Sequence, residues 1–315
     1  MKASSVLNKI ISWLGLFFFV LAGYMIYHQL SKYTLDELKS AVLNIPNKNL
    51  IYAGIASFLG YIALSTYDYL ALKYIKKKMQ YWKWILTGFI GFSVSNNAGH
   101  AIVSGGAVRY RFYTRWGISA GDIVKMVTFS GFTYLIACFF LIILGYVLTP
   151  EHAFGGNEST KISTFITMIL SVIGLGIYFW ASIYYKKSVT IKGVKFKMPK
   201  FRLAMEQMLI GSIDIVMASL VLYSVLICFV EMDFMTFMGA FIIAQVLGVY
   251  SQVPGGLGVF ELVFSNILPG QDNQAILFGA LIAYRIIYYL LPLVLSGIVL
   301  FVYEYMKADE KLEEA

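Results

Sequence analysis

The sequence Val253-Pro254-Gly255-Gly256 interrupts an apolar stretch in the second half of the chain, and Glu261 follows five residues after it. The sequence Val103-Ser104-Gly105-Gly106 interrupts the first half 150 positions earlier, and Arg111 follows at the same spacing. A broken apolar segment that recurs at corresponding places in two halves indicates a binding site in a repeat-built transporter. These two stretches therefore predict a membrane transporter assembled from two related halves.

The composition places the chain in a membrane. Hydrophobic residues make up 59% of the 315 residues and charged residues 13%, with a mean hydropathy of +0.73. A soluble domain normally carries about 25% charged residues. The net charge of +8 lies in short loops beside apolar runs, so we expect no nucleic acid partner. Cys138 and Cys228 each lie alone in an apolar run, so we expect no metal site and no cofactor.

Eight apolar runs are long enough to enter the bilayer. They cover 11–29, 50–72, 83–103, 123–148, 162–183, 208–230, 235–250 and 275–303. If every run crossed once, the basic loops 73–82 and 184–207 would lie on opposite sides, against the positive-inside rule. A re-entrant hairpin broken at Ser104-Gly105-Gly106 puts both loops in the cytoplasm. A second hairpin, broken at Pro254-Gly255-Gly256, then enters from the other side.

This assignment gives an all-α, polytopic integral membrane protein. We expect about six full transmembrane helices and two re-entrant helical hairpins in an inverted-topology repeat. The chain forms a single transmembrane domain over 1–315, in which 1–150 is the first repeat, 151–305 is the second and 306–315 is a short cytoplasmic tail. We expect both termini in the cytoplasm. Each Gly-Gly pair alone also suits an ordinary helix crossing, so the flanking charges and the charge rule favour the break.

Polar residues within the apolar runs are the candidate binding residues, because such groups are costly when they face lipid. In the first hairpin we expect Arg109 and Arg111 to hold a phosphate bidentately, although positive-inside residues at the interface explain Arg109 equally well. Arg285 lies deep in the final run and needs an anionic partner, either Glu261 or a substrate phosphate. Glu261 has three alternatives: a pair with Arg111, a pair with Arg285, or a proton. The remaining candidates are Asn96, Asn97, His100, Gln245, Gln252 and Asp68.

Two aspartates have open roles at this point. Asp68 either balances the neighbouring lysines or pairs with a buried arginine, and Asp214 is either interfacial or a similar partner. The chain has no GxSxG, HExxH or P-loop motif, so we expect neither an enzyme nor intrinsic ATP drive.

Segments 91–121 and 244–264 carry a resemblance to a known family. Ser104-Gly105-Gly106 with Arg109-Tyr110-Arg111, and Pro254-Gly255-Gly256 with Gly258-Val259-Phe260-Glu261, resemble the lysylphosphatidylglycerol synthase transmembrane region family. That family includes the YbhN-like proteins and the flippase domain of the multiple peptide resistance factor. The resemblance covers about 10–305 and implies lipid translocation between leaflets of a bacterial or archaeal inner membrane. We expect the soluble synthase domain of the two-domain relatives to be missing from this chain.

The leading hypothesis is a lipid flippase whose substrate is an aminoacyl-phosphatidylglycerol or a related anionic lipid. One alternative is a membrane enzyme, or enzyme subunit, that acts on a phospholipid or polyprenyl-phosphate. Another is a scaffold that docks a separate cytoplasmic synthase through the basic loop 184–207. The expected partners are membrane phospholipids, with a cytoplasmic lipid-modifying enzyme and a second copy of the chain as further hypotheses.

Overall fold

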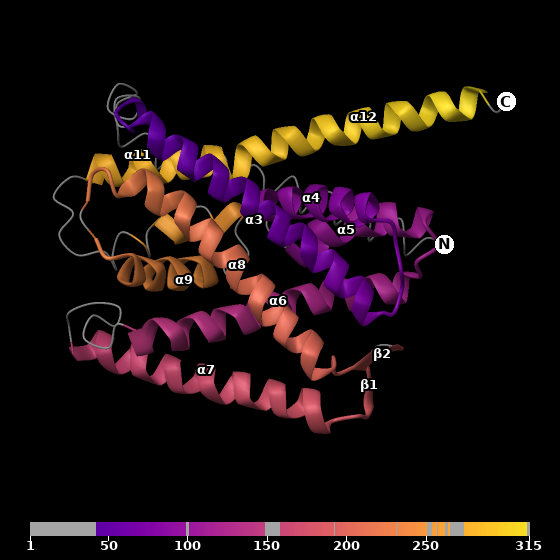
Figure 1. Cartoon of the computed structure of the whole chain (residues 1–315), viewed down its shortest axis with the longest axis horizontal. Helices are drawn as coiled ribbons and strands as arrows, with labels where there is room; N and C mark the ends of the chain where they lie inside the picture. The colour runs from indigo at the N-terminus through magenta and orange to yellow at the C-terminus, as the bar shows by residue number, and fades with distance from the viewer. Residues whose placement is uncertain are drawn as a thin grey trace.

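The computed structural model describes residues 42–98, 101–148, 158–191, 193–230, 232–250, 254–256, 258–261, 264 and 274–313. These residues form helices joined by short loops (Figure 1). The helices are α3 (Asn47–Tyr74), α4 (Tyr81–Ala98), α5 (Ala101–Arg115), α6 (Ala120–Leu148), α7 (Glu158–Tyr184), α8 (Phe201–Leu226), α9 (Phe234–Tyr250), the 3-10 turn η1 (Pro254–Gly256), α11 (Gln274–Arg285), the π-helix η2 (Ile286–Leu290) and α12 (Leu291–Glu313). Strands β1 (Ser188–Ile191) and β2 (Val194–Lys197) form an antiparallel pair.

The predicted all-α polytopic class is confirmed. Among the described residues, five helices are long and apolar enough to cross a membrane: Asn47–Tyr74, Ala120–Leu148, Ile162–Tyr184, Phe201–Leu226 and Gly279–Met306. The predicted first span, 11–29, lies outside the described residues. Part of the expected tail, 306–313, continues helix α12. The basic loop predicted over 184–207 is shorter than expected, because α8 already begins at Phe201.

Helices α3 and α8 lie side by side in the centre of the molecule and run antiparallel (Figure 1). Lys73 pairs with Glu206 at one end, and Asn49 donates to the Ser224 carbonyl at 2.6 Å at the other. An added Cβ at Gly60 would lie 3.3 Å from Met217 Cβ, which shows how closely the backbones approach. Equivalent helices of an inverted repeat run in opposite directions. The antiparallel pair fits that architecture, and the repeat boundaries stay a prediction.

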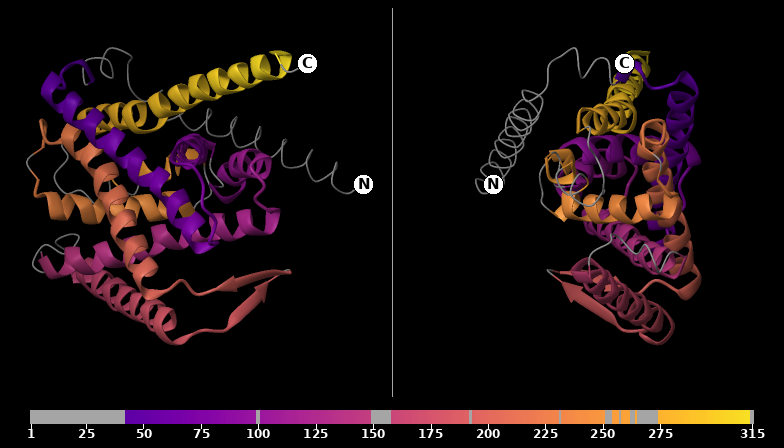
Figure 2. Two further views of the ribbon diagram at one scale, coloured as in Figure 1. Left: turned by 45° about the vertical axis from the view of Figure 1, so that its right-hand side comes forward. Right: turned by 90° about the vertical axis from the view of Figure 1, so that its left-hand side faces the viewer.

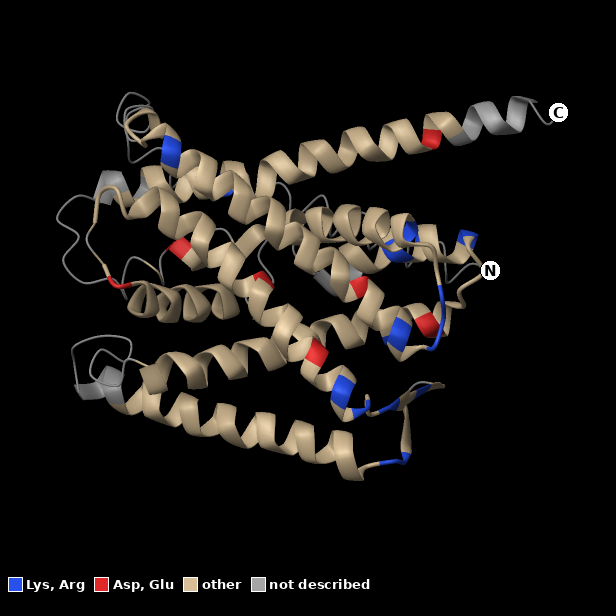
Figure 3. Cartoon of the chain, in the orientation of Figure 1, with Lys and Arg blue, Asp and Glu red and all other residues tan. Residues whose placement is uncertain are grey.

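The two basic loops lie at the same end of the molecule, as the charge rule predicted. The Tyr74 hydroxyl at the end of α3 donates to the Lys197 carbonyl in β2 at 2.7 Å. Figure 3 shows lysines and arginines gathered at the end where α3 and α7 finish and α4, α6 and α8 begin. Helix α7 packs chiefly on α6, at the edge of the molecule opposite α12 (Figure 2). A re-entrant first hairpin requires the loops 73–82 and 184–207 to lie on one side of the membrane, and their shared end meets this requirement.

The first hairpin consists of α4 and α5, which pack antiparallel. Gly91 lies against Arg109, and a Cβ at Gly105 would lie 2.0 Å from Ser95 Oγ. The predicted break at Ser104-Gly105-Gly106 is wrong, because all three residues lie inside α5. The connection is residues 99 and 100, which the structure does not describe. The absent side chain at Gly105 permits close helix contact, so this pair serves the helix crossing that the sequence left as the alternative.

The second hairpin is broken where the sequence predicted. Helix α9 ends at Tyr250, and Pro254-Gly255-Gly256 forms a single 3-10 turn. Gly255 and Gly256 have φ of 60° and 62°, a region that side chains with a Cβ rarely adopt. The chain then returns along α9 through residues 258–261 and 264, since Phe241 packs on Phe260 and Phe237 on Phe264. We call residues 258–261 and 264 the returning segment.

Candidate functional site: a cavity between two hairpins

A cavity of about 690 Å³ lies between the two hairpins. Its walls come from α3, α4, α5, α6, α8, α9, η1, the returning segment and η2. Ser95, Asn96 and Arg109 face it from the first hairpin. Gln245, Gly255 and Gly256 face it from the second. Irregular backbone at membrane depth is tolerated only where it is buried in protein or lines a wet cavity, and the turn at Gly255 meets that condition.

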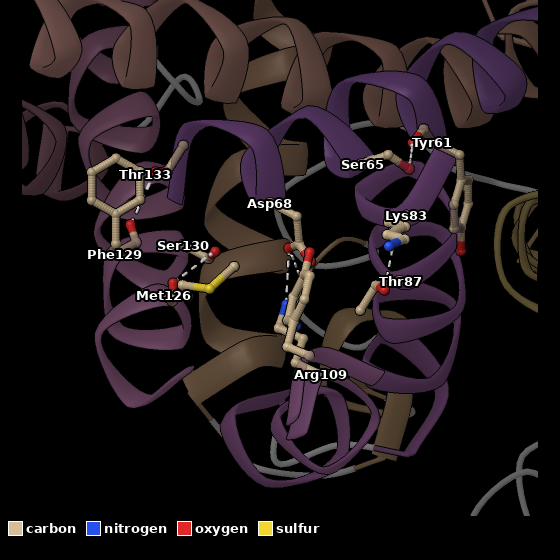
Figure 4. Close-up of polar contacts among 11 residues, drawn as sticks. Tyr61, Ser65, Asp68, Lys83, Thr87, Arg109, Met126, Phe129, Ser130 and Thr133 are labelled. Atoms are coloured by element: carbon tan, nitrogen blue, oxygen red, sulfur yellow. Dashed lines mark hydrogen bonds and ion pairs between the residues drawn. The ribbon is translucent and has the colours of Figure 1, made fainter. Parts of the chain in front are cut away.

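Asp68 and Arg109 form a buried ion pair beside this cavity. Arg109 Nε donates to Asp68 Oδ1 at 2.9 Å, and the Tyr113 hydroxyl donates to Asp68 Oδ2 at 2.8 Å. Figure 4 shows Asp68 of α3 and Arg109 of α5 pointing toward each other. The side chains are 0% and 3% exposed, and the guanidinium lies 4.4 Å from the centre of the Phe92 ring. The pair joins α3 to the first hairpin, so Asp68 has the buried arginine, and not the neighbouring lysines, as its partner.

Glu261 and Arg285 form a second pair, which holds the turn of the second hairpin. Arg285 Nη2 lies 2.6 Å from Glu261 Oε1, and Arg285 also donates to the Gly255 carbonyl. Glu261 Oε2 accepts the backbone N–H of Gly258 at 2.7 Å. The pair with Arg285 was one of three alternatives for Glu261, and it is the one that forms. Neither side chain lines the cavity, so both act on the shape of its wall.

The remaining candidates divide into three groups. Asn96 and Gln245 line the cavity, and the Asn96 amide lies 3.4 Å from the Tyr61 hydroxyl. Asn97 does not line the cavity, because its amide donates to the backbone carbonyls of Ser93 and Tyr289. His100 and Gln252 lie outside the described residues.

Arg111 is not placed with the cavity. Its side chain is 53% exposed and pairs with Glu304 of α12 at 2.9 Å, as does Arg115 at 2.8 Å. A helix turns by about 100° per residue, so a residue two positions from Arg109 faces away from it. Arg109 therefore occupies the buried position beside the cavity and pairs with Asp68, whereas Arg111 forms an ion pair at the surface.

Asp214, for which the sequence left an interfacial role or a pair with a buried arginine, is held by two tyrosines instead. Asp214 lies in the middle of α8, lines the cavity and accepts the Tyr67 hydroxyl at 2.9 Å and the Tyr288 hydroxyl at 3.3 Å. The apolar run suggested a start near 208, which placed Asp214 close to an interface. Because α8 begins at Phe201, Asp214 is fourteen residues into a candidate span. In the described part of the chain, no group of three or more His, Cys, Asp or Glu residues could hold a metal.

The family described as the lysylphosphatidylglycerol synthase TM region matches residues 11–296. The chain belongs to this family. An uncharacterised protein of Synechocystis is 32% identical over 289 residues, covering 89% of this chain and 87% of the relative. Inner membrane protein YbhN of Escherichia coli is 27% identical over 296 residues, covering 92% and 90%.

The chain is also similar to part of longer proteins. The phosphatidylglycerol lysyltransferase of Staphylococcus xylosus is 26% identical over 299 residues, which is 94% of this chain and 34% of that enzyme. This chain thus corresponds to about a third of the lysyltransferase. The family match and the five apolar helices make this chain a multi-pass membrane protein.

Proposed function

We propose that the protein translocates a phospholipid between the leaflets of the membrane. The observation that carries this proposal is the cavity of about 690 Å³, which lies between two hairpins that enter from opposite ends. Sites that bind drug-sized molecules occupy about 300–1,000 Å³. The cavity is therefore large enough for a lipid headgroup, and its polar wall residues provide hydrogen-bond partners for one.

The acyl chains remain in the bilayer in this proposal, so the cavity needs a lateral opening. Three residues of its wall are exposed, and we assign the lateral opening to them: Gly131 and Phe132 of α6 and Val249 of α9. Phe132 is 47% exposed and Val249 is 45% exposed. An apolar, exposed wall between α6 and α9 suits the neck of a lipid, where the headgroup enters and the chains stay outside. We call these three residues the lateral opening.

The family supports a phospholipid as the cargo. The lysyltransferase relatives act, by their name, on phosphatidylglycerol, and their match to this chain covers the membrane region. An aminoacyl-phosphatidylglycerol or a related anionic lipid is thus the first cargo to examine. The proposal places the protein in the bacterial cytoplasmic membrane, with the lysine-rich end and both termini in the cytoplasm.

A second candidate function rests on the strand pair. Strand β2 carries the exposed Lys195 and Lys197, and it pairs with β1, which is exposed along its whole length. The two strands project from the body of helices (Figure 2). A basic, exposed hairpin is suited to an acidic partner, so a separate cytoplasmic lipid-modifying enzyme is the proposed partner there. Neutralising its lysines would abolish co-purification of such an enzyme while leaving lipid translocation unchanged.

An enzymatic role for the chain itself predicts product formation by the purified protein, which the transport proposal does not.

The direct experiment blocks the lateral opening. Purified protein is reconstituted into proteoliposomes with a panel of head-group-labelled lipids, and exchange between leaflets is measured by accessibility to an impermeant quencher. Gly131→Trp should abolish exchange, because a Cβ at Gly131 meets no atom within 4 Å and the indole would lie across the opening. Gly176→Trp is the matched control, since Gly176 is an exposed, open position of α7 outside the cavity. Equal rates in both variants, or no exchange by the wild type with any lipid, would refute the proposal.

A further inference from the structure

Asp214 differs from Asp68 and Glu261, the other buried acids near the cavity. Asp214 is 4% exposed and lies within a helix long enough to span the membrane. Tyr67 donates to one of its oxygens from α3, and Tyr288 donates to the other from η2. Two hydroxyl donors orient the carboxylate, but they supply no positive charge.

No cation forms an ion pair with Asp214 among the described residues, and Arg109, which lines the same cavity, is paired with Asp68. Asp68 is paired with Arg109 and Glu261 with Arg285, whereas no lysine, arginine or histidine of the described chain lies within 4.0 Å of the Asp214 oxygens. The titratable side chains near Asp214 are neutral at pH 7 and come from α3, α6 and η2: Tyr61, Tyr67, Tyr134, Cys138 and Tyr288. Helix α9 contributes Phe241 and Gln245 to the same cavity, and neither is ionisable.

An unbalanced carboxylate inside a membrane is costly, and the cost is removed when the group takes up a proton. Ionisable residues of this kind mark proton and ion pathways in pumps and transporters. We propose that Asp214 is a proton-binding site that couples lipid translocation to the proton gradient across the membrane. This inference rests on the proposed function and adds its energy source.

The coupling follows from the elements that Asp214 joins. As a carboxylate it accepts hydrogen bonds from α3 and η2 simultaneously. Protonation forms an O–H bond on one carboxylate oxygen, with the proton taken from water on one side of the membrane, and that oxygen becomes a donor. One tyrosine hydrogen bond is then weakened. Because η2 is a π-helix directly before α12, a weaker bond to Tyr288 loosens α8 from the last span. Release of the proton to water on the other side restores both hydrogen bonds.

The test measures where the lipid stands at equilibrium as well as how fast it moves. Wild-type protein is reconstituted in vesicles with a fixed pH difference, and the ratio of labelled lipid between leaflets is followed to its plateau. Coupling to one proton shifts that ratio by about tenfold per pH unit, since a pH unit corresponds to a tenfold change in proton activity. A ratio that ignores the pH difference while exchange continues would overturn the proton site and leave the proposed function intact. Absence of exchange would overturn both.

Variants assign the effect to Asp214. In Asp214→Asn the leaflet ratio should no longer respond to the pH difference, whereas Glu206→Gln, an acid of the same helix in a surface pair with Lys73, should retain the wild-type response. If Asp214→Asn does not fold, Tyr288→Phe replaces it: without this donor the carboxylate is less stable, so the pH dependence of the exchange rate should move to higher pH. A wild-type response in Asp214→Asn, an unmoved profile in a folded Tyr288→Phe, or a ratio that follows a sodium gradient instead, would contradict the proposal.

Discussion

Asp68→Asn should destabilise the protein far more than loss of a surface ion pair. The variant leaves the Arg109 guanidinium, 3% exposed, without its counter-charge, and the new amide cannot accept from both Arg109 and Tyr113. Removing one partner of a buried pair costs about 3–5 kcal/mol. The ratio of folded to unfolded protein should therefore fall by about 10²- to 10⁴-fold.

The assay is equilibrium unfolding of the purified full chain in mixed micelles, with increasing denaturing detergent. Glu304→Gln is the matched control, because Glu304 is half-exposed and its pairs with Arg111 and Arg115 lie at the surface. Surface pairs contribute about 0–1 kcal/mol. Adding Arg109→Gln to Asp68→Asn removes the stranded charge and should recover part of the loss. Equal destabilisation by Asp68→Asn and Glu304→Gln would refute the reasoning.

Three further outcomes follow from the geometry. Gly88→Ala should cost about 1–3 kcal/mol, because the added Cβ would lie 2.7 Å from Ser65 Cα in α3, whereas Gly54→Ala has open space and should be neutral or stabilising in the same unfolding assay. Arg285→Lys should slow lipid exchange even though the charge is kept, because lysine cannot hold both Glu261 and the Gly255 carbonyl; an unchanged exchange rate would show that the clamp is dispensable. Arg111→Ala should leave lipid exchange at the wild-type rate. A complete loss of exchange would show that Arg111 belongs to the binding site after all.

The second hairpin could be predicted from sequence because its signals are local. Proline lacks the N–H that a helix needs, and Gly255 and Gly256 adopt a positive φ that other residues avoid. The first Gly-Gly pair has the same letters but a different role, since Gly105 lies inside α5 where its missing side chain admits Ser95. The sequence alone does not distinguish a glycine that breaks a helix from one that allows a close approach.

The charge rule predicted the arrangement of the loops better than the helix boundaries. It required 73–82 and 184–207 on one side, and the bond from Tyr74 to Lys197 places them at one end. The site depended on finer details. Arg109 and Arg111 differ only in which face of α5 they occupy, and Asp214 was misplaced because the polar first turns of α8 hid where that helix begins. The positions of these three side chains depend on how helices distant in the sequence pack together, which the sequence pattern does not give.

A lipid that moves between the leaflets through the cavity must reach it from both sides of the membrane, and one cysteine in the cavity tests this access. Gln245→Cys is introduced after Cys138→Ala and Cys228→Ser, which removes the native thiols. A membrane-impermeant thiol reagent is then applied from either side, with Lys77→Cys in the loop between α3 and α4 as the marker of one side. Gln245→Cys should react from both sides and Lys77→Cys from one. Reaction of Gln245→Cys from a single side, or from neither, would contradict access from both sides.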